Sequence, residues 1–426
     1  MKRIRFGAAL MRTHRFLPPF ICLLVLGRTA HAQPSQSQLA QPEMLPVEST
    51  SQQTMTNEFQ VFAVPKPPPQ PMPYEPFQMG KFIFRPHVDY TFMEAHGLLA
   101  APGDPENTTV QQFSPGLLID FGDHWALDDT MTFAQYSNKH FGNEFDNALT
   151  LTGQTVYTDW VLGFLQTADE SSSPLIETAA QTEVQTYSTA VTGHHEVSEH
   201  VSEDLAVEQD MYFVSGGFQD SRDWYTLDWL NYDFTKRFSI GVGGGVGYVN
   251  VDFGSDQTYE EALGRLNWRV SDKISLQLNG GAEEWEFLDA NSGGALFDPV
   301  YGGSIQYQPF ANTSLYASAN RAITESFYRG EVTDSTILNV GWNQRVLGQL
   351  YFNLNGGYEK TQFIVQGNTL ENNRTDTDYY IGARLSHSFL KRGTISLFYQ
   401  YSDQKSTAVG FTYKSNQEGV EVSYGF

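Results

Sequence analysis

The fold is decided by the last eight residues, Gly419-Val420-Glu421-Val422-Ser423-Tyr424-Gly425-Phe426. Every second side chain is apolar, and the residues between them are small or polar. Because successive side chains of an extended chain point to opposite faces, this pattern predicts a β-strand with one apolar face and one polar face.

The same alternation recurs through residues 81–426, most clearly in 238–248, 349–359 and 394–402. Short polar turns are expected at 122–124, 158–159, 236–237, 271–273, 311–312, 347–348 and 391–393. Longer connections are expected near 96–109, 168–176, 252–258, 288–298 and 364–377. Short turns at one end and long loops at the other are typical of transmembrane barrels.

We therefore predict an all-β fold, a closed antiparallel transmembrane β-barrel of about 18 strands, with 16–18 compatible with the segment boundaries. Its outer belt would contain Leu350, Phe352, Leu354, Ile395, Leu397, Val420 and Val422.

The N-terminal region has a different composition. A basic start, an apolar stretch from Phe16 to Leu26 and the triplet Ala30-His31-Ala32 predict a signal peptide over residues 1–32. Cys22, the one cysteine, would leave with it, so no disulfide or thiolate metal site is expected. Residues 33–80 are rich in Gln, Ser and Pro, which predicts a disordered periplasmic arm.

Charge excludes some partners. Residues 1–32 carry six basic and no acidic residues, so their removal would change the formal net charge from −23 to −29. So acidic a chain repels nucleic acid.

No window after residue 32 contains 18 apolar residues, so no transmembrane helix is expected. The expected partners are outer-membrane lipid, the barrel-assembly machinery during insertion, and small hydrophilic solutes.

Two features resemble known proteins. A terminal strand ending in an aromatic residue resembles the sorting signal of outer-membrane barrels, because an exposed edge can add to the sheet of an assembly machine. The resemblance assigns membrane assembly to Val420, Val422, Tyr424 and Phe426. Stretches such as 113–117, 122–125, 159–164, 229–232, 301–307 and 389–394 resemble the β-barrel porin 2 family of bacterial outer-membrane proteins. That resemblance implies a barrel and a porin role, without a substrate or site residues.

Three motifs that suggest enzymatic or ligand chemistry fail on spacing or context. His195 and His200 are five residues apart, which does not fit a zinc-protease helix, and a polar periplasmic turn is expected there. The glycines of 241–247 lack the Lys-Ser/Thr of a phosphate loop and are expected to permit bending and close approach in a strand. The acidic clusters 260–261 and 283–286 are expected to form a solvated or cation-binding rim rather than the carboxylate pair of a glycosidase. We expect no enzyme activity, no cofactor and no metal.

The polar face of the strands would line the lumen, because a lipid-facing charge near the membrane midplane costs about 2–4 kcal/mol. The predicted pore-lining residues are Arg265, Arg269, Glu283, Arg345, Asn353, Asn355, Glu359, Arg384, Gln400 and Glu421. The four arginines are expected to face Glu283 and Glu359. These residues favour a porin-like channel for passive diffusion in the bacterial outer membrane. The alternative is a barrel component of polysaccharide export or envelope assembly.

Overall fold

The computed structural model describes residues 77–426 except 123, 289–294, 366–373 and 391. The predicted signal peptide, and the predicted arm up to residue 76, lie outside the described residues. None of the described residues belongs to a helix long and apolar enough to cross a membrane.

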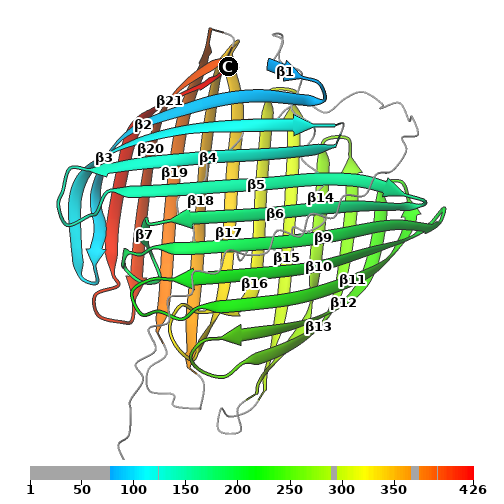
Figure 1. The fold of residues 1–426 in the computed structure, drawn as a ribbon. Helices are drawn as coiled ribbons and strands as arrows, with labels where there is room; N and C mark the ends of the chain where they lie inside the picture. Colours follow the sequence, from blue (N-terminus) through cyan, green and yellow to red (C-terminus); the bar gives the residue numbers. More distant parts are fainter. Residues whose placement is uncertain (1–76, 123, 289–294, 366–373, 391) are drawn as a thin grey trace, which may run out of the picture. The chain divides into compact units, whose positions relative to one another are not determined.

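The described chain consists of β-strands joined by turns and loops (Figure 1). The strands are β1 (Phe77–Met79), β2 (Phe82–Ala101), β3 (Asp104–Phe121), β4 (Trp125–Tyr136), β5 (Glu144–Tyr157), β6 (Trp160–Ser171), β7 (Pro174–Leu175), β8 (Ala180–Gln181), β9 (Val184–Ser198), β10 (Val201–Val214), β11 (Ser221–Thr235), β12 (Phe238–Val251), β13 (Gln257–Ser271), β14 (Ile274–Phe287), β15 (Leu296–Phe310), β16 (Thr313–Glu325), β17 (Glu331–Leu347), β18 (Leu350–Val365), β19 (Thr375–Phe389), β20 (Gly393–Ser406) and β21 (Tyr413–Gly425).

Eighteen of these strands form one closed antiparallel barrel, as predicted. Each pairs with its neighbour in the chain, and β6 pairs with β9 across the small β7–β8 hairpin. Closure comes from β2 and β21, which pair from His87↔Gly425 to His96↔Asn416. Because the first and last strands pair, the barrel has no free sheet edge.

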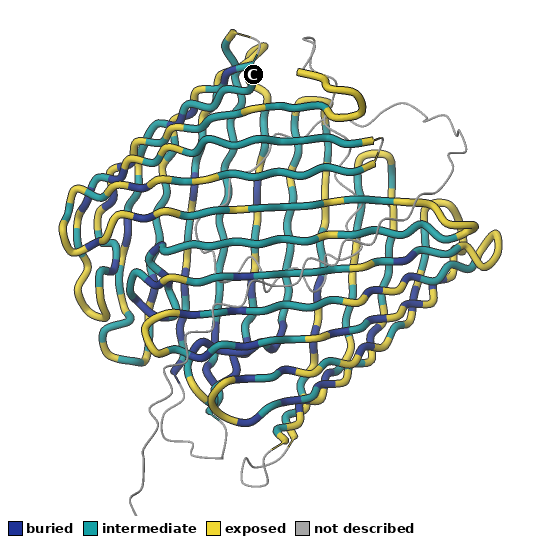
Figure 2. The backbone as a smooth tube through the Cα atoms, viewed as in Figure 1, coloured by how far each residue is buried: buried dark blue, intermediate teal, exposed yellow. Residues whose placement is uncertain are grey.

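Exposure alternates along the strands, as the sequence pattern predicts (Figure 2). On β12, Ile240, Val242 and Val246 are exposed, whereas Gly241 and Gly245 between them are buried. The predicted belt residues Ile395 and Leu397 are also exposed. The other belt residues are half-buried and pair in register with exposed apolar side chains, for example Val420 with Phe92 and Val422 with Tyr90.

The short turns and the long loops lie at opposite ends of the barrel. All seven predicted turns fall between consecutive strands, although residues 123 and 391 of two of them lie outside the described residues. They lie at the end where β2 begins and β21 finishes. In outer-membrane barrels the short turns face the periplasm, so this is the periplasmic end. The longer connections, at the extracellular end, follow β4, β6, β10, β14, β18 and β20, and those after β14 and β18 lie largely outside the described residues.

Two sequence expectations about boundaries need correction. The long connection expected at 96–109 is mostly strand, because β2 and β3 extend as a hairpin that turns at residues 102–103. Phe77–Met79, within the stretch assigned to the arm, forms β1 and pairs with Phe82–Phe84 of β2. The apolar side chains of Phe77 and Met79 lie opposite Phe84 and Phe82, and such cross-strand pairs favour a strand at this position.

Glycines of β12 let large inward side chains cross this strand. A Cβ at Gly247 would lie 2.1 Å from the Tyr259 ring, and a Cβ at Gly243 would lie 2.6 Å from the Trp229 ring. These rings belong to a buried cluster with Tyr225, Trp285 and Val300. The expected role of the glycine run, close approach within a strand, is confirmed.

Candidate functional site: the polar lumen

One face of the barrel wall is polar and the other apolar, and the two faces have different environments. The apolar face carries exposed side chains such as Phe92, Val340 and Leu397. Such a band has no counterpart in a water-soluble sheet and matches the lipid-facing surface of a membrane barrel. The chain is an outer-membrane β-barrel. Its functional groups must therefore be sought on the inward face.

Arg265 is the centre of an inward network on β9 to β13. Its guanidinium bonds the Asn231 amide oxygen at 2.7 Å and forms an ion pair with Asp204. It also lies 4.5 Å from the centre of the Trp229 ring. His194 Nδ1 approaches the same Asp204 carboxylate at 2.5 Å. Arg265 reaches this network because it passes over β12 at a glycine: a Cβ at Gly241 would lie 3.0 Å from Arg265 Cγ.

Arg384 and Glu421 form a second inward pair, on β19 and β21. The guanidinium donates a hydrogen bond of 3.0 Å to the Glu421 carboxylate, which is buried. The Phe398 ring of β20 lies between the two strands, 5.3 Å from the guanidinium carbon. Both partners were predicted to face the lumen, but the pairing was not. The expectation that arginines would face Glu283 and Glu359 is wrong for Arg265 and Arg384, because nearer carboxylates on adjoining strands pair with them.

The amides predicted for the lumen lie in one area of β18 to β20. Asn353 donates to Asn343 of β17. Asn355 lies over Gly382, where a Cβ would be 2.6 Å from its Oδ1. Gln400 occupies the position opposite Gly382 in the next strand. Glu359 lies further toward the extracellular end and accepts a hydrogen bond of 2.9 Å from Thr361.

Two of the predicted arginines are exposed near the periplasmic turns. Arg345, close to the end of β17, donates to the Gly348 carbonyl and lies 5.7 Å from the Tyr351 ring centre. Arg269, close to the end of β13, is held through its backbone, which donates to the Arg237 carbonyl at 2.7 Å. Both lie near the periplasmic end of the barrel.

Glu283 is not on a rim. It is buried within β14, directly opposite Glu261 of β13 and Asp298 of β15, and it accepts a hydrogen bond of 2.6 Å from the Trp285 indole. The strands continue beyond this row toward the extracellular side, so the acidic residues form part of the lumen wall. The expectation of a solvated rim is corrected for Glu261 and Glu283, because β13 and β14 are longer than the alternation indicated.

The four C-terminal residues assigned to membrane assembly lie on and after β21. Val420 and Val422 share the outward face with Phe92 and Tyr90 of β2. The rings of Tyr424 and Phe426 lie 5.0 Å apart, and the Phe426 backbone donates to the Pro86 carbonyl at 2.8 Å.

Sequence reasoning did not find a loop that crosses the lumen. Residues 172–183, which contain β7 and β8, leave the wall after β6. Near their own side of the barrel, Gln181 donates to Glu144 of β5 at 2.6 Å. At the far side, the Glu177 carboxylate accepts hydrogen bonds from the Ser326 hydroxyl at 2.7 Å and from the Phe327 amide at 2.8 Å. The loop thus joins opposite walls near the extracellular end.

A second contact holds the loop at the far wall. Arg374, just before β19, donates to the Glu177 carbonyl at 2.8 Å, while its guanidinium forms an ion pair with Asp376. Burial raises the pKa of the Glu177 carboxyl to about 7, against the lowering effect of its two hydrogen bonds. The sequence signal for this loop is weak, because it depends on contacts roughly 150 and 200 residues away.

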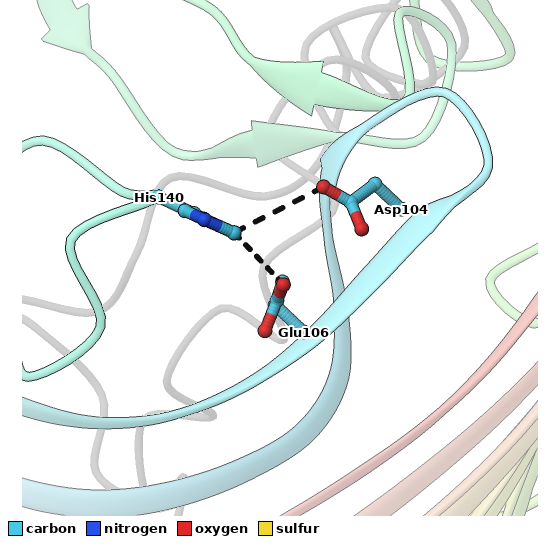
Figure 3. Close-up of side chains that lie close together, drawn as sticks. All are labelled: Asp104, Glu106 and His140. Atoms are coloured by element: carbon cyan, nitrogen blue, oxygen red, sulfur yellow. Dashed lines mark ion pairs between the residues drawn. The ribbon is translucent and has the colours of Figure 1, made fainter.

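At the extracellular rim, His140 lies between two carboxylates (Figure 3). Its Nδ1 is 2.8 Å from Glu106 and 3.9 Å from Asp104, and all three offer ligand atoms within 4.8 Å of one another. Asn138 also bonds Glu106 at 2.9 Å. The His140 and Asp104 side chains are more than half exposed, so the arrangement is an exposed ion-pair group.

No family model matches the chain, and no curated protein is similar to it, so the resemblance to the β-barrel porin 2 family stays a prediction. Several solved outer-membrane structures are similar to the barrel. The outer-membrane protein OpdK of Pseudomonas aeruginosa is 12% identical, with 80% of this chain and 98% of that chain covered and a TM-score of 0.44.

Two further structures give similar values. OpdO of the same organism is 9% identical over 81% of this chain and 97% of that chain, with a TM-score of 0.45. OccAB3 of Acinetobacter baumannii is 8% identical over 82% of this chain and 100% of that chain, also with a TM-score of 0.45. At these values the likeness assigns no substrate and no site to this chain.

Proposed function

We propose that this protein is a channel through which small hydrophilic solutes diffuse passively across the outer membrane. The observation that carries the proposal is the inward face of an 18-stranded barrel, where charged pairs such as Arg265–Asp204 and Arg384–Glu421 stand among amides. Barrels of this size enclose more space than side chains alone fill. Charges of both signs on such a wall are the usual lining of a water-filled path.

The path would be narrowed at two levels. Near the extracellular end, the loop 172–183 crosses the lumen and fixes Glu177 against the far wall. Further toward the periplasm, the Arg265 and Arg384 networks project from the wall. A solute would pass between these groups without any bond being made or broken. The residues that we propose line this path are Arg265, Arg269, Glu283, Arg345, Asn353, Asn355, Glu359, Arg384, Gln400 and Glu421.

Single-channel recording in planar bilayers tests the proposal. The wild-type protein, refolded in detergent and shown to be β-structured by circular dichroism, is expected to give discrete conductance steps. A salt gradient then measures ion selectivity. Arg345→Glu should shift the reversal potential toward cations, because its charge acts on passing ions at reduced dielectric. Arg345→Lys keeps the charge and should leave the potential unchanged.

The two possible failures differ. A folded wild-type barrel without conductance would overturn the channel proposal. A conducting barrel whose selectivity is the same in Arg345→Glu and Arg345→Lys would remove Arg345 from the path while leaving the channel in place.

A further inference from the structure

A small cavity of about 40 Å³ lies on the lumen wall beneath the crossing loop. Strands β16 to β20 form its floor, and Ile176 and Glu177 of the loop cover it. Among the described residues that line it, four are carboxylates and none is a lysine, arginine or histidine. The carboxylates are Glu177, Glu359, Asp376 and Asp378.

Three of these carboxylates already receive hydrogen bonds from the protein, and Glu359 is one of them through Thr361. Asp376 receives both Arg374 Nε contacts, at 3.0 and 2.9 Å, within a bidentate ion pair. Glu177 receives the Ser326 hydroxyl and the Phe327 amide. Arg374 also donates to the Glu177 carbonyl and forms its ion pair with Asp376.

Asp378, the fourth carboxylate, lies next to Glu359. Glu359 of β18 and Asp378 of β19 occupy directly opposite positions in the register, where like charges destabilise a sheet. Asp378 is 8% exposed, and its Oδ1 has no hydrogen-bond partner among the described residues. Gln404 of β20 is next in the row, is fully buried, and has an Oε1 that likewise lacks a partner there.

The row therefore presents hydrogen-bond acceptors on three adjacent strands, which are spaced by about 4.8 Å. Burying an acceptor without a hydrogen-bond partner costs free energy, and the cost is larger when the acceptor is charged. A ligand that relieves this cost must offer several N–H donors and a positive charge. A planar guanidinium does so with five donors and pairs well with carboxylates, and an ammonium group does so with three.

We propose that this cavity binds a small organic cation whose guanidinium or primary ammonium head contacts Asp378, Glu359 and Gln404. This inference rests on the proposed channel function, for which it names the class of solute. A bare metal ion fits less well, because Ile176, Ile337 and Phe363 also line the cavity and offer no ligand atoms. These apolar side chains suit the methylene chain of an aliphatic amine.

The test uses agmatine, which has a guanidinium, an ammonium and no carboxylate. Calorimetric titration of the folded, full-length protein in detergent should show binding. The double variant Asp378→Asn with Glu359→Gln keeps the side-chain shapes and removes the charge; its affinity should fall at least about tenfold, since one lost charge-assisted bond is worth that much. The matched control is Asp169→Asn, which removes a carboxylate from β6, away from the cavity, and should bind agmatine as the wild type does.

Circular dichroism and heat modifiability establish that each variant is folded. A wild type that conducts in bilayers but does not bind agmatine overturns the inference and leaves the channel proposal intact. Binding that is equal in the double variant and the wild type also overturns it. A titration with calcium chloride tests the competing ligand. If calcium binds at the same carboxylates and displaces agmatine, the site is a metal site and the organic-cation proposal is overturned. Agmatine binding by a barrel that does not conduct would support the site and overturn the channel.

Discussion

The carboxylate of Glu177 accepts a hydrogen bond of 2.7 Å from the hydroxyl of Ser326, 149 residues further along the chain. The first residue belongs to the loop that crosses the lumen, and the second belongs to the loop between β16 and β17 on the opposite wall. This contact and the hydrogen bond from the adjacent Phe327 amide hold the middle of the crossing loop against the opposite wall. In the proposed channel, the width of the path would thus depend on a polar contact as well as on the strands.

Glu177→Ala should raise the mean single-channel conductance. The substitution removes two hydrogen bonds to a carboxylate, worth together about 3 kcal/mol, so the loop should leave the far wall more often. Bilayer recording of the variant against the wild type measures the change. Glu183→Ala alters an exposed residue of the same loop and should conduct like the wild type. Equal conductance in all three proteins would show that the loop does not narrow the path.

Conductance of the wild type should rise between pH 5 and pH 8. Burial raises the pKa of the docked Glu177 to about 7, against an ordinary value of 4.5. The docked loop therefore binds more protons than the released loop between these values, so docking is favoured at low pH and weakened as pH rises through 7. Glu177→Gln cannot ionise and should show a flatter pH profile. A rise of equal size in the variant would assign the effect to other groups.

Removing the cation beside Glu421 should destabilise the barrel. Arg384→Gln leaves a buried carboxylate without its ion-pair partner, and we expect a loss of about 2 kcal/mol in the free energy of unfolding. Urea unfolding followed by tryptophan fluorescence measures it. The double variant Arg384→Gln with Glu421→Gln removes both charges and should recover most of the loss. If the double variant is no more stable than Arg384→Gln alone, the ion pair is not the cause.

Gly247→Ala should cost stability, whereas Gly244→Ala should not. The added Cβ at position 247 would overlap the Tyr259 ring at 2.1 Å, and overpacking of this kind costs about 1–3 kcal/mol. At position 244, on the outward face, the nearest atom would be 3.5 Å away, an ordinary contact. Urea midpoints of the two variants should separate by this amount. Equal midpoints would mean that the Tyr259 ring moves without cost.

Val420→Asp with Val422→Asp should block insertion into the outer membrane. Both positions share the outward face with Phe92 and Tyr90, where an aspartate side chain would face lipid and destabilise the barrel. Heat modifiability and fractionation of cell envelopes report insertion. Gln417→Glu adds a charge to the inward face of the same strand and should insert normally. Deletion of Phe426 should also lower the inserted amount, if the terminal residue is read during assembly.

The sequence determined the barrel, a strand number of about 18 and, where the alternation is clear, which face of a strand meets lipid. These properties follow from a local period of two, so they can be read without knowing what each strand touches. The inward positions of Arg265, Arg384 and Glu421 follow from the same alternation, because each residue occupies a polar position of its strand.

Only the tertiary structure decided which inward groups meet. Arg265 reaches Asp204 across Gly241, a contact that depends on the stagger of strands β10 to β13. Residues 176–177 of the crossing loop line the cavity together with strands β16 to β20. No local sequence pattern predicts this contact between the loop and the opposite wall. The alternation along a strand fixes the face on which a residue lies. Its partners across the lumen are set by the strand register and by loop contacts, and only the closed barrel brings these distant segments together.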